Sequence, residues 1–434
     1  MEPFKKRFAD KAMPRVDEFR KLITGHADKI IGEVTIGSVL TGMRGTVSLL
    51  TDTSKLDPEE GIRFRGYSIP ELREKLPKVN PEGEPLPEGL FYLMLLGDIP
   101  TDEEVEQLSK EFASRSELPD YVYRVIDAMP VDARPMVQFS AAILSMATDS
   151  KFQSAYMDGT GKTEFWDSTY EDVMDLIARL PRIAAYIYRR IYYDNKQIEP
   201  DKSLDWAANM AHMMGYDNHE VHRLMRLYMF LHADHEGGNV SAHTTHLVGS
   251  ALSNPYYAYA AGMTGLAGPL HGFANQEVVR WVFKMIEEIG PACEDKDKIR
   301  QYVIKTIEEG KVIPGYGHAV LRKTDPRFTA QHEFGKKYLP DDPWFITLTC
   351  LYEVVPEVLG SISKIKNPWP NVDAGSGVLL MHYGIKEFDF YTVLFGVSRA
   401  LGVLASLLWD RAYGLPIERP TSHTLEWFKE KAGI

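Results

Sequence analysis

The longest apolar run of the chain extends from Tyr391 to Trp409 and contains one charged residue, Arg399, near its middle. A helix of this length and composition is a candidate for crossing a membrane. The arginine and the small residues around it favour another interpretation, because a charge inside an apolar helix is costly and usually functional. The run therefore predicts a buried helix that carries a functional charge, and no membrane span.

The composition is that of an ordinary soluble globular protein, with 44% apolar and 25% charged residues among 434. This length suggests two to three domains. Lys and Arg number 49 against 61 Asp and Glu, a net charge of −12, which disfavours binding to nucleic acids or anionic membranes. The only cysteines are Cys293 and Cys350, so we expect neither a disulfide framework nor a thiolate metal site.

Apolar residues at helical spacing predict that nearly all of the chain after Pro70 is α-helical. Thr101 and Glu104 form a capping box, which marks one helix start. The glycine-rich stretch 32–66 differs and predicts short strands and turns. No linker-like segment is present, so we expect the domains to be interwoven. Expected helices include residues 2–30, 171–195, 203–215, 220–233 and 274–288.

A basic segment from Gly315 to Arg327 combines an imidazole, His318, with the guanidiniums of Arg322 and Arg327. Its glycines let the backbone approach a ligand closely. Guanidiniums suit carboxylates or phosphates, and a neutral imidazole donates a hydrogen bond to a carbonyl. The segment predicts an anion site, although a solvated basic loop is the more frequent meaning of such a composition taken alone.

Two His-x-x-His pairs flank a Gly-Gly break: His232 with His235, and His243 with His246. Residues three apart share a helix face, so each pair is a candidate metal site. However, the glycines separate the pairs, no cysteine assists, and the H-E-x-x-H pattern is absent. Capping or core histidines are therefore favoured over metal ligands.

Two further residues stand where their surroundings would tune their pKa. His271 lies just before an expected helix, whose N-terminal dipole would lower the imidazole pKa and keep it neutral. Asp373 is bracketed by Val372 and Ala374, so partial desolvation would raise its pKa, as a general base needs. The alternatives are an ordinary loop histidine and an aspartate that caps the following helix.

Taken together, these stretches resemble the citrate synthase family, in particular its mitochondrial branch. The resemblance runs from the first helix to Leu415–Pro420. It is carried by four motifs in the same order as in the family. They are His235-Glu236-Gly237-Gly238-Asn239-Val240-Ser241-Ala242-His243, Gly268-Pro269-Leu270-His271-Gly272, the segment Gly315–Arg327, and Asn367-Pro368-Trp369-Pro370-Asn371-Val372-Asp373.

The resemblance implies a catalytic set. Asp373 would take a proton from the methyl group of acetyl-CoA while His271 donates to the thioester oxygen. His318 would polarise the keto carbonyl of oxaloacetate, and hydrolysis of citryl-CoA would give citrate and CoA. No metal or redox cofactor would be needed.

The resemblance also implies how both substrates are bound. The carboxylates of oxaloacetate would contact Arg327, Arg399 and Arg419, with His235 assisting. The implied CoA-binding residues are Arg44, Lys162, Val312, Gly315, Gly317, Arg322, Lys364, Lys366 and Asn371. Two positions depart from the branch: Lys162 replaces an arginine and loses its bidentate fork, and Gly375 stands where histidine is frequent.

For the fold, the resemblance implies an all-α, citrate synthase-like protein with minor short strands near the N-terminus. Residues 1–268 and 381–434 would form a large domain, and residues 269–380 a small mobile one that closes over the substrates. Oxaloacetate would bind first and drive that closure. The C-terminal arm would carry Arg419 into the partner subunit's site, so we expect a homodimer.

The same branch implies the mitochondrial matrix, although no transit peptide is visible in the acidic-residue-containing N-terminus. Two alternatives stay open at this stage. A 2-methylcitrate synthase would use propionyl-CoA, since one extra methylene is weakly discriminated in an apolar pocket. A non-catalytic acyl-CoA-binding or structural relative is disfavoured by the presence of His271, His318 and Asp373.

Overall fold

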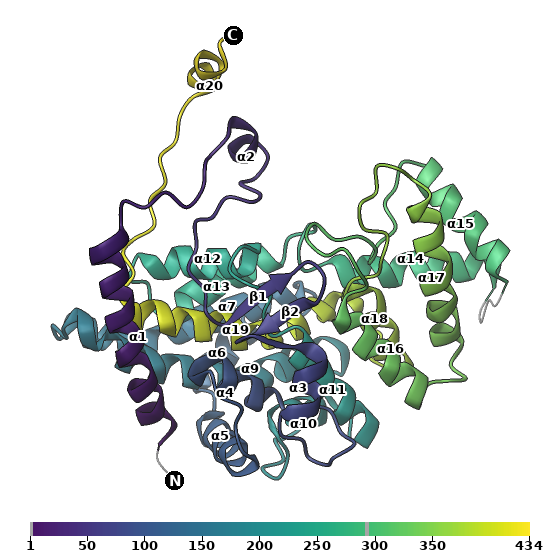
Figure 1. Cartoon of the computed structure of the whole chain (residues 1–434). Helices are drawn as coiled ribbons and strands as arrows, with labels where there is room; N and C mark the ends of the chain where they lie inside the picture. Colours follow the sequence, from purple (N-terminus) through teal and green to yellow (C-terminus); the bar gives the residue numbers. More distant parts are fainter. Residues whose placement is uncertain (1–2, 291–294) are drawn as a thin grey trace.

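The computed structural model describes residues 3–290 and 295–434 and is predominantly helical (Figure 1). Cys293 lies outside the described residues. The α-helices are α1 (Phe4–His26), α2 (Ile36–Leu40), α3 (Ile69–Lys75), α4 (Pro87–Leu96), α5 (Asp102–Arg115), α6 (Asp120–Asp127), α7 (Pro135–Ser145), α8 (Lys151–Met157), α9 (Phe165–Tyr192), α10 (Trp206–Met214), α11 (His219–Leu231), α12 (Val240–Ser250), α13 (Pro255–Leu266), α14 (Ala274–Ile289), α15 (Lys296–Glu308), α16 (Pro326–Tyr338), α17 (Pro343–Gly360), α18 (Asp373–His382), α19 (Tyr391–Tyr413) and α20 (Leu425–Ala432). Short 3₁₀ turns are η1 (Met146–Asp149), η2 (Lys162–Glu164) and η3 (Phe388–Phe390).

The helices predicted from apolar spacing are present, with boundaries shifted by a few residues. The capping box forms as expected: the side chain of Thr101 accepts from the backbone N–H of Glu104, whose carboxylate accepts from the N–H of Thr101. The expectation for residues 32–66 is partly wrong, because residues 36–40 form the helix α2. The side chains of Thr35 and Ser38 cap this single turn reciprocally, which offsets the helix-disfavouring glycines nearby.

The expected strands begin at Ser54. A three-stranded antiparallel sheet consists of β1 (Ser54–Asp57), β2 (Gly61–Phe64) and β3 (Tyr67–Ser68), in that order. The register pairs Ser54 with Phe64 and Leu56 with Ile62. Leu56, Ile62 and Phe64 are buried, so the sheet is anchored to the helical core.

Helix α19 runs through the centre of the protein, as its apolar sequence predicts (Figure 1). It packs against α9, α12, α13, α11, α4 and α1. Its length and composition match those of a membrane-spanning helix, but 94% of its most apolar window is buried inside the protein. Arg399 is 1% exposed, so this charge lies within the core and needs partners there.

A second hydrophobic core lies apart from the main one, among α14, α15 and α17. Figure 1 shows these helices gathered with α16 and α18 at one side of the molecule. This second core includes Val282, Met285, Val303, Leu351 and Val355. Helices α16 and α18 instead contribute to the main core, so they join the two bodies.

The segments around α2 and α20 project from the helical body on the same side, away from α14–α18 (Figure 1). Both carry exposed apolar side chains, including Ile30 at 84%, Ile31 at 75% and Leu425 at 58%. Large apolar side chains left in water on extended arms are typical of a surface that another chain covers.

Candidate functional site

Hydrogen bonds join the loop before α16 to the loop before α18. The N–H of Gly317 donates to the carbonyl of Trp369 (2.9 Å), and the N–H of Asn371 donates to that of Gly315 (2.8 Å). The Asn371 amide donates to the Gly317 carbonyl. Gly315 has φ +78°, and a Cβ there would lie 2.9 Å from the backbone of Ala374, so only glycine fits. These hydrogen bonds fix His318 relative to the start of α18.

The imidazole of His318 is held in one tautomer. Its Nδ1 accepts hydrogen bonds from the backbone N–H groups of Val320 (3.0 Å) and Leu321 (3.1 Å). The proton of the neutral ring must therefore be on Nε2. Burial, assisted by the charge of Arg327, lowers the pKa of His318 to about 4. At neutral pH this residue is an uncharged hydrogen-bond donor through Nε2.

His271 is held in the opposite tautomer. Its Nε2 accepts from the backbone N–H of Ser241 (3.2 Å) and lies 2.9 Å from the Ser241 hydroxyl. The neutral ring therefore carries its proton on Nδ1. Its pKa is lowered to about 4, as expected in direction, but the main cause is burial, followed by the charge of Arg399. The main cause is therefore burial, whereas the sequence suggested a helix dipole.

Asp373 is the first residue of α18 and provides the carboxyl group of the site. Burial raises its pKa from 3.8 to about 6, against the opposing charges of Arg327 and Arg399. Asp373 lies inside the first turn of α18 and its side chain makes no capping bond, so the alternative of a capping aspartate is wrong. The N–H of Asp373 donates to the side-chain oxygen of Asn371 (3.0 Å), which fixes the residue at the loop junction. A carboxyl group with this pKa is largely ionised at pH 7 and still basic enough to take a proton.

Arg327, in the first turn of α16, is one of two buried guanidiniums in this site. The buried carboxylate of Asp325 accepts hydrogen bonds from Nε (3.0 Å) and Nη2 (2.7 Å) of Arg327. This bidentate pair orients the guanidinium. Sequence analysis gave Asp325 no role. Its position before Pro326, typical of a helix N-cap, was the available signal, and its side chain does accept from the N–H of Arg327.

Arg399, from the middle of α19, is the second buried guanidinium. It donates to the carbonyl of His232 (3.2 Å), to the side-chain oxygen of Asn239 (3.0 Å) and to the hydroxyl of Ser241 (3.2 Å). Its guanidinium also lies over the ring of Phe395. Ser241 thus contacts both Arg399 and His271, a link that sequence analysis missed although Ser241 lies within a motif it used.

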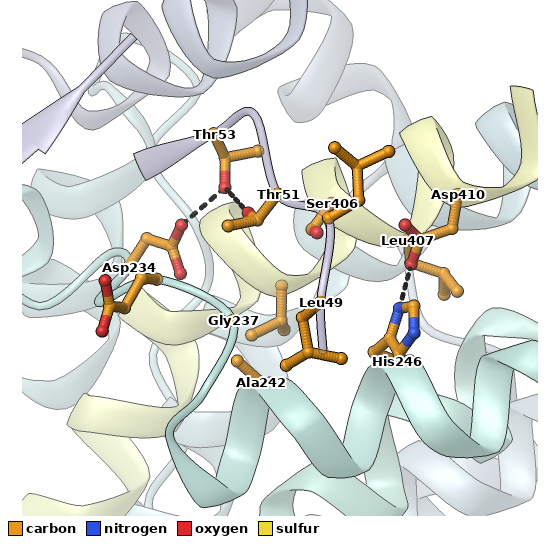
Figure 2. Close-up of a pocket in the computed structure, with 13 residues that line it drawn as sticks. Leu49, Thr51, Thr53, Asp234, Gly237, Ala242, His246, Ser406, Leu407 and Asp410 are labelled. Carbon is orange, nitrogen blue, oxygen red and sulfur yellow. Dashed lines mark hydrogen bonds and ion pairs between the residues drawn. The ribbon is translucent and has the colours of Figure 1, made fainter. Parts of the chain in front are cut away.

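His235 faces His318, with ring centroids 5.4 Å apart. Its Nε2 is buried and has no hydrogen-bond partner among the residues that the structure describes. The loop before it is fixed by the start of β1, because the hydroxyls of Thr53 and Ser54 both donate to Asp234 (2.7 Å each; Figure 2 draws the Thr53 bond). An orphaned buried nitrogen beside two guanidiniums is suited to an anionic ligand.

Several of the expected CoA-binding residues lie together beside this cluster. A cleft of about 1100 Å³ between α14, α15 and the following loop is lined by Val312 and Gly315. Lys364 and Lys366 are exposed on the loop between α17 and α18. The backbone of Arg322 is anchored to the carbonyl of Pro58 (2.8 Å). Gly317 and Asn371 belong to the two joined loops described above.

Three of the expected residues are not brought to the cluster within one chain. Arg44 and Arg419 are exposed on the segments that project with α2 and α20, away from α14–α18 (Figure 1). Lys162 lies in η2 beside the end of α19, where a Cβ at Gly414 would be 3.3 Å from its Cε. A single chain therefore holds the buried catalytic cluster but not its full set of expected cations.

The histidine pairs have separate surroundings. His232 is buried and stacks on Tyr228, whereas His243 and His246 contact Glu418 and Asp410. In residues 3–290 and 295–434, no His, Cys, Asp and Glu side chains form a group of three or more suited to a metal ion.

The helical fold and this site define a class: an all-α protein whose carboxyl group, neutral imidazoles and buried guanidiniums suit acid–base chemistry on an anionic ligand. Comparison with known proteins specifies it further. Residues 42–421 match the family model described as citrate synthase, C-terminal domain. The chain belongs to the citrate synthase family.

Individual relatives agree with this assignment. The chain is 56% identical to "Citrate synthase 4, mitochondrial" of Arabidopsis thaliana over 95% of this chain and 87% of the relative. It is 52% identical to "Citrate synthase, mitochondrial" of Saccharomyces cerevisiae over 99% and 89%. The crystal structure of citrate synthase from Pyrobaculum aerophilum aligns with a TM-score of 0.77 and 28% identity, over 92% of this chain and 95% of that one.

Proposed function

We propose that Asp373, His271 and His318 carry out the citrate synthase reaction in this chain. The chain is an acyltransferase of this family, which condenses acetyl-CoA with oxaloacetate and releases citrate and CoA. One observation carries the assignment of roles: a buried carboxyl with a pKa of about 6 accompanies two neutral imidazoles with opposite, fixed tautomers. A base and two uncharged donors are what this reaction requires.

In the first step, the Asp373 carboxylate removes a proton from the methyl carbon of acetyl-CoA. The electron pair of that C–H bond moves into the C–C bond, and the thioester oxygen gains negative charge. The Nδ1–H of His271 donates to this oxygen, because its Nε2 is already occupied by Ser241. A neutral donor suits this oxygen because it stabilises the developing charge without a permanent positive charge beside the base.

In the second step, the enolate carbon attacks the keto carbon of oxaloacetate. The Nε2–H of His318 donates a hydrogen bond to the keto oxygen, which becomes an alkoxide. This oxygen takes up a proton to form the hydroxyl of citryl-CoA, which balances the proton that Asp373 removed from the methyl group. Arg327, Arg399 and His235 contact the oxaloacetate carboxylates and orient the keto carbon. Water then attacks the citryl thioester, the C–S bond breaks, and citrate and CoA leave. No step needs a metal or a redox cofactor.

For CoA, the cationic groups of Arg44, Lys162, Arg322, Lys364 and Lys366 bind phosphates. Val312, Gly315, Gly317 and Asn371 line the path of the nucleotide and its arm. Because Arg44 and Lys162 lie away from the other residues in one chain, their contribution requires a second chain. Arg419 likewise lies away from the other oxaloacetate-binding residues, so its contribution also requires a second chain.

The functional unit is a homodimer in which Arg419 of each chain completes the partner's oxaloacetate site. The exposed apolar side chains on the projecting segments support this unit, since Ile30, Ile31 and Leu425 would be covered in a dimer. The exposed position of Arg419 supports it as well. The compartment is the mitochondrial matrix, in keeping with the relatives named as mitochondrial enzymes.

Residues 269–380 form a small domain that closes over the bound substrates, and residues 1–268 and 381–434 form the large domain. The separate hydrophobic core among α14, α15 and α17 supports a body able to move as a unit. Closure excludes water until the carbon–carbon bond has formed. Because Asp373 and His318 lie in the small domain and Arg399 in the large one, oxaloacetate joins the two and promotes closure.

The experiment is CoA-thiol release by the purified protein with oxaloacetate, comparing acetyl-CoA with propionyl-CoA. We expect acetyl-CoA to be preferred and the Asp373→Asn variant to lose about 10²- to 10⁴-fold in kcat. Preference for propionyl-CoA would identify methylcitrate synthesis instead. Absence of turnover with both thioesters would refute the proposed function.

A further inference from the structure

The segment that carries Arg419 is tied to the protein at the neighbouring residue, Glu418. This segment joins the end of α19 to the start of α20 and has no regular secondary structure. The N–H of Glu418 donates to the hydroxyl of Ser250, the last residue of α12 (3.0 Å). Both the backbone and the side chain of Glu418 are held, because its carboxylate also contacts the histidines of α12.

The carboxylate of Glu418 forms ion pairs with two histidines on one face of α12. Its Oε1 lies 3.0 Å from Nε2 of His243, and its Oε2 lies 3.4 Å from Nε2 of His246. The two histidines are three residues apart, so both rings emerge on the same side of the helix. Their side chains are only 25% and 18% exposed, which makes the contact partly shielded from water.

His246 also bonds to α19 on its other side. Its Nδ1 lies 2.8 Å from the Oδ2 of Asp410, a bond visible in Figure 2. The protonated ring attracts both carboxylates: it is hydrogen-bonded to Asp410 and forms an ion pair with Glu418. The neighbouring Asp410 raises the pKa of His246, which favours the charged ring that pairs with both carboxylates. His246 therefore connects the buried carboxylate of Asp410 to Glu418.

The N-terminal turn of α12 is also part of the chain's own active site. Asn239, its N-cap, and Ser241 hold Arg399, and Ser241 also holds His271. The helix that contacts Glu418 is therefore also hydrogen-bonded to Arg399, proposed to bind oxaloacetate, and to His271, proposed to act on acetyl-CoA. The same helix therefore fixes the position of Glu418 and the positions of Arg399 and His271.

We propose that Glu418, gripped by His243 and His246, is a positioning residue that presents Arg419 to the oxaloacetate site of the partner subunit. The proposal rests on the role in the partner's site proposed above for Arg419. Successive side chains of an extended chain point to opposite sides. Glu418 is turned toward α12 while Arg419 is exposed. Pro416 and Pro420 flank the pair and restrict the backbone, so fixing Glu418 directs the next side chain outward.

The first test is the Glu418→Gln variant, which keeps the shape and removes the charge. We expect the KM for oxaloacetate to rise about tenfold, the loss typical of a weakened charge-assisted contact. The KM for acetyl-CoA at saturating oxaloacetate and kcat should stay within about twofold, and sedimentation should show an intact dimer. Glu418→Asp should recover part of the loss. Glu103→Gln, an exposed carboxylate on α5 away from the projecting segments, is the matched control and should match the unmodified protein.

The second test uses mixed dimers of a Glu418→Gln subunit with an Arg399→Ala subunit. One site then has its own intact Arg399 and receives Arg419 from an arm with an intact Glu418. We expect about half of the normal kcat, one working site of two, with the unmodified KM for oxaloacetate. If the working site keeps the raised KM, Glu418 acts on its own subunit and the proposal is overturned.

The Arg419→Ala variant separates the role of Arg419 in oxaloacetate binding from the positioning role of Glu418. If it raises the KM for oxaloacetate and Glu418→Gln does not, the positioning role alone is overturned. If Arg419→Ala leaves this KM unchanged, the role of Arg419 is refuted and the positioning role falls with it. Citrate synthesis by the unmodified protein is measured alongside and tests the proposed reaction independently of both roles.

Discussion

Replacing Asp373 with asparagine should remove activity and at the same time stabilise the protein. The carboxyl group has an ordinary pKa of 3.8 and a folded-state pKa of about 6, because it is buried. At about 1.4 kcal/mol per pKa unit, ionisation of the folded protein at pH 7 or above costs about 3 kcal/mol of stability. Asparagine has the same shape and never ionises, so this cost disappears in the variant.

The direction of the pH dependence follows from the raised pKa. Below pH 3.8 both folded and unfolded states are protonated, and the stability of the unmodified protein is fully present. As the pH rises toward 6, the unfolded state loses its proton first and stability is lost, after which the loss is constant. The variant should therefore gain about 1.5 kcal/mol over the unmodified protein at pH 5 and about 3 kcal/mol at pH 8.

Urea unfolding of both proteins at equal subunit concentration, at pH 5 and at pH 8, measures this difference. Asp341→Asn, at an exposed carboxyl group, is the control and should show no pH-dependent gain. A gain for Asp373→Asn that is the same at both pH values would refute the assignment of a buried, destabilised base. So would a variant that is less stable at pH 8 than at pH 5 relative to the unmodified protein.

The remaining predictions concern binding and pH. The value of kcat/KM for acetyl-CoA should rise with pH up to an inflection near 6 and then level off, because the Asp373 base must be ionised; a profile without this inflection would contradict that role. Asp325→Asn should raise the KM for oxaloacetate about 10- to 100-fold by releasing Arg327, and an unchanged KM would contradict the bidentate pair. Acetyl-CoA should bind more tightly with oxaloacetate present, by calorimetry with an inert CoA thioether, and equal affinities would refute substrate-driven closure.

Much of the fold is visible in the sequence because helical periodicity and burial coincide. The apolar run of α19 and the capping box of α5 are local signals, and the structure bears them out. Helix α2 was missed because a single turn has too few residues for a periodic signal, and its side-chain caps decide the conformation. The strands β1 and β2 were expected, but the bond from Ser54, the first residue of β1, to Asp234 joins residues far apart in the sequence.

The candidate site could be predicted only in part from the residues themselves. The basic segment with Arg327 and the charge of Arg399 inside an apolar helix were real signals, whereas the roles came from family resemblance. The tautomers of His271 and His318 have no sequence signal, since they depend on which backbone N–H groups reach each ring. The low pKa of His271 was expected from a helix dipole, whereas its main cause is burial, which arises from tertiary packing and has no local sequence signal.

The carbon–carbon bond formed in the reaction can be followed directly with an isotope label. The purified protein is mixed with oxaloacetate and acetyl-CoA labelled with ¹³C in the methyl group, and the products are observed by NMR. We expect the label to appear in a methylene carbon of citrate, with one free CoA thiol for each citrate formed. Labelled acetate released with CoA, and no labelled citrate, would mean that the site only hydrolyses the thioester and would contradict the account.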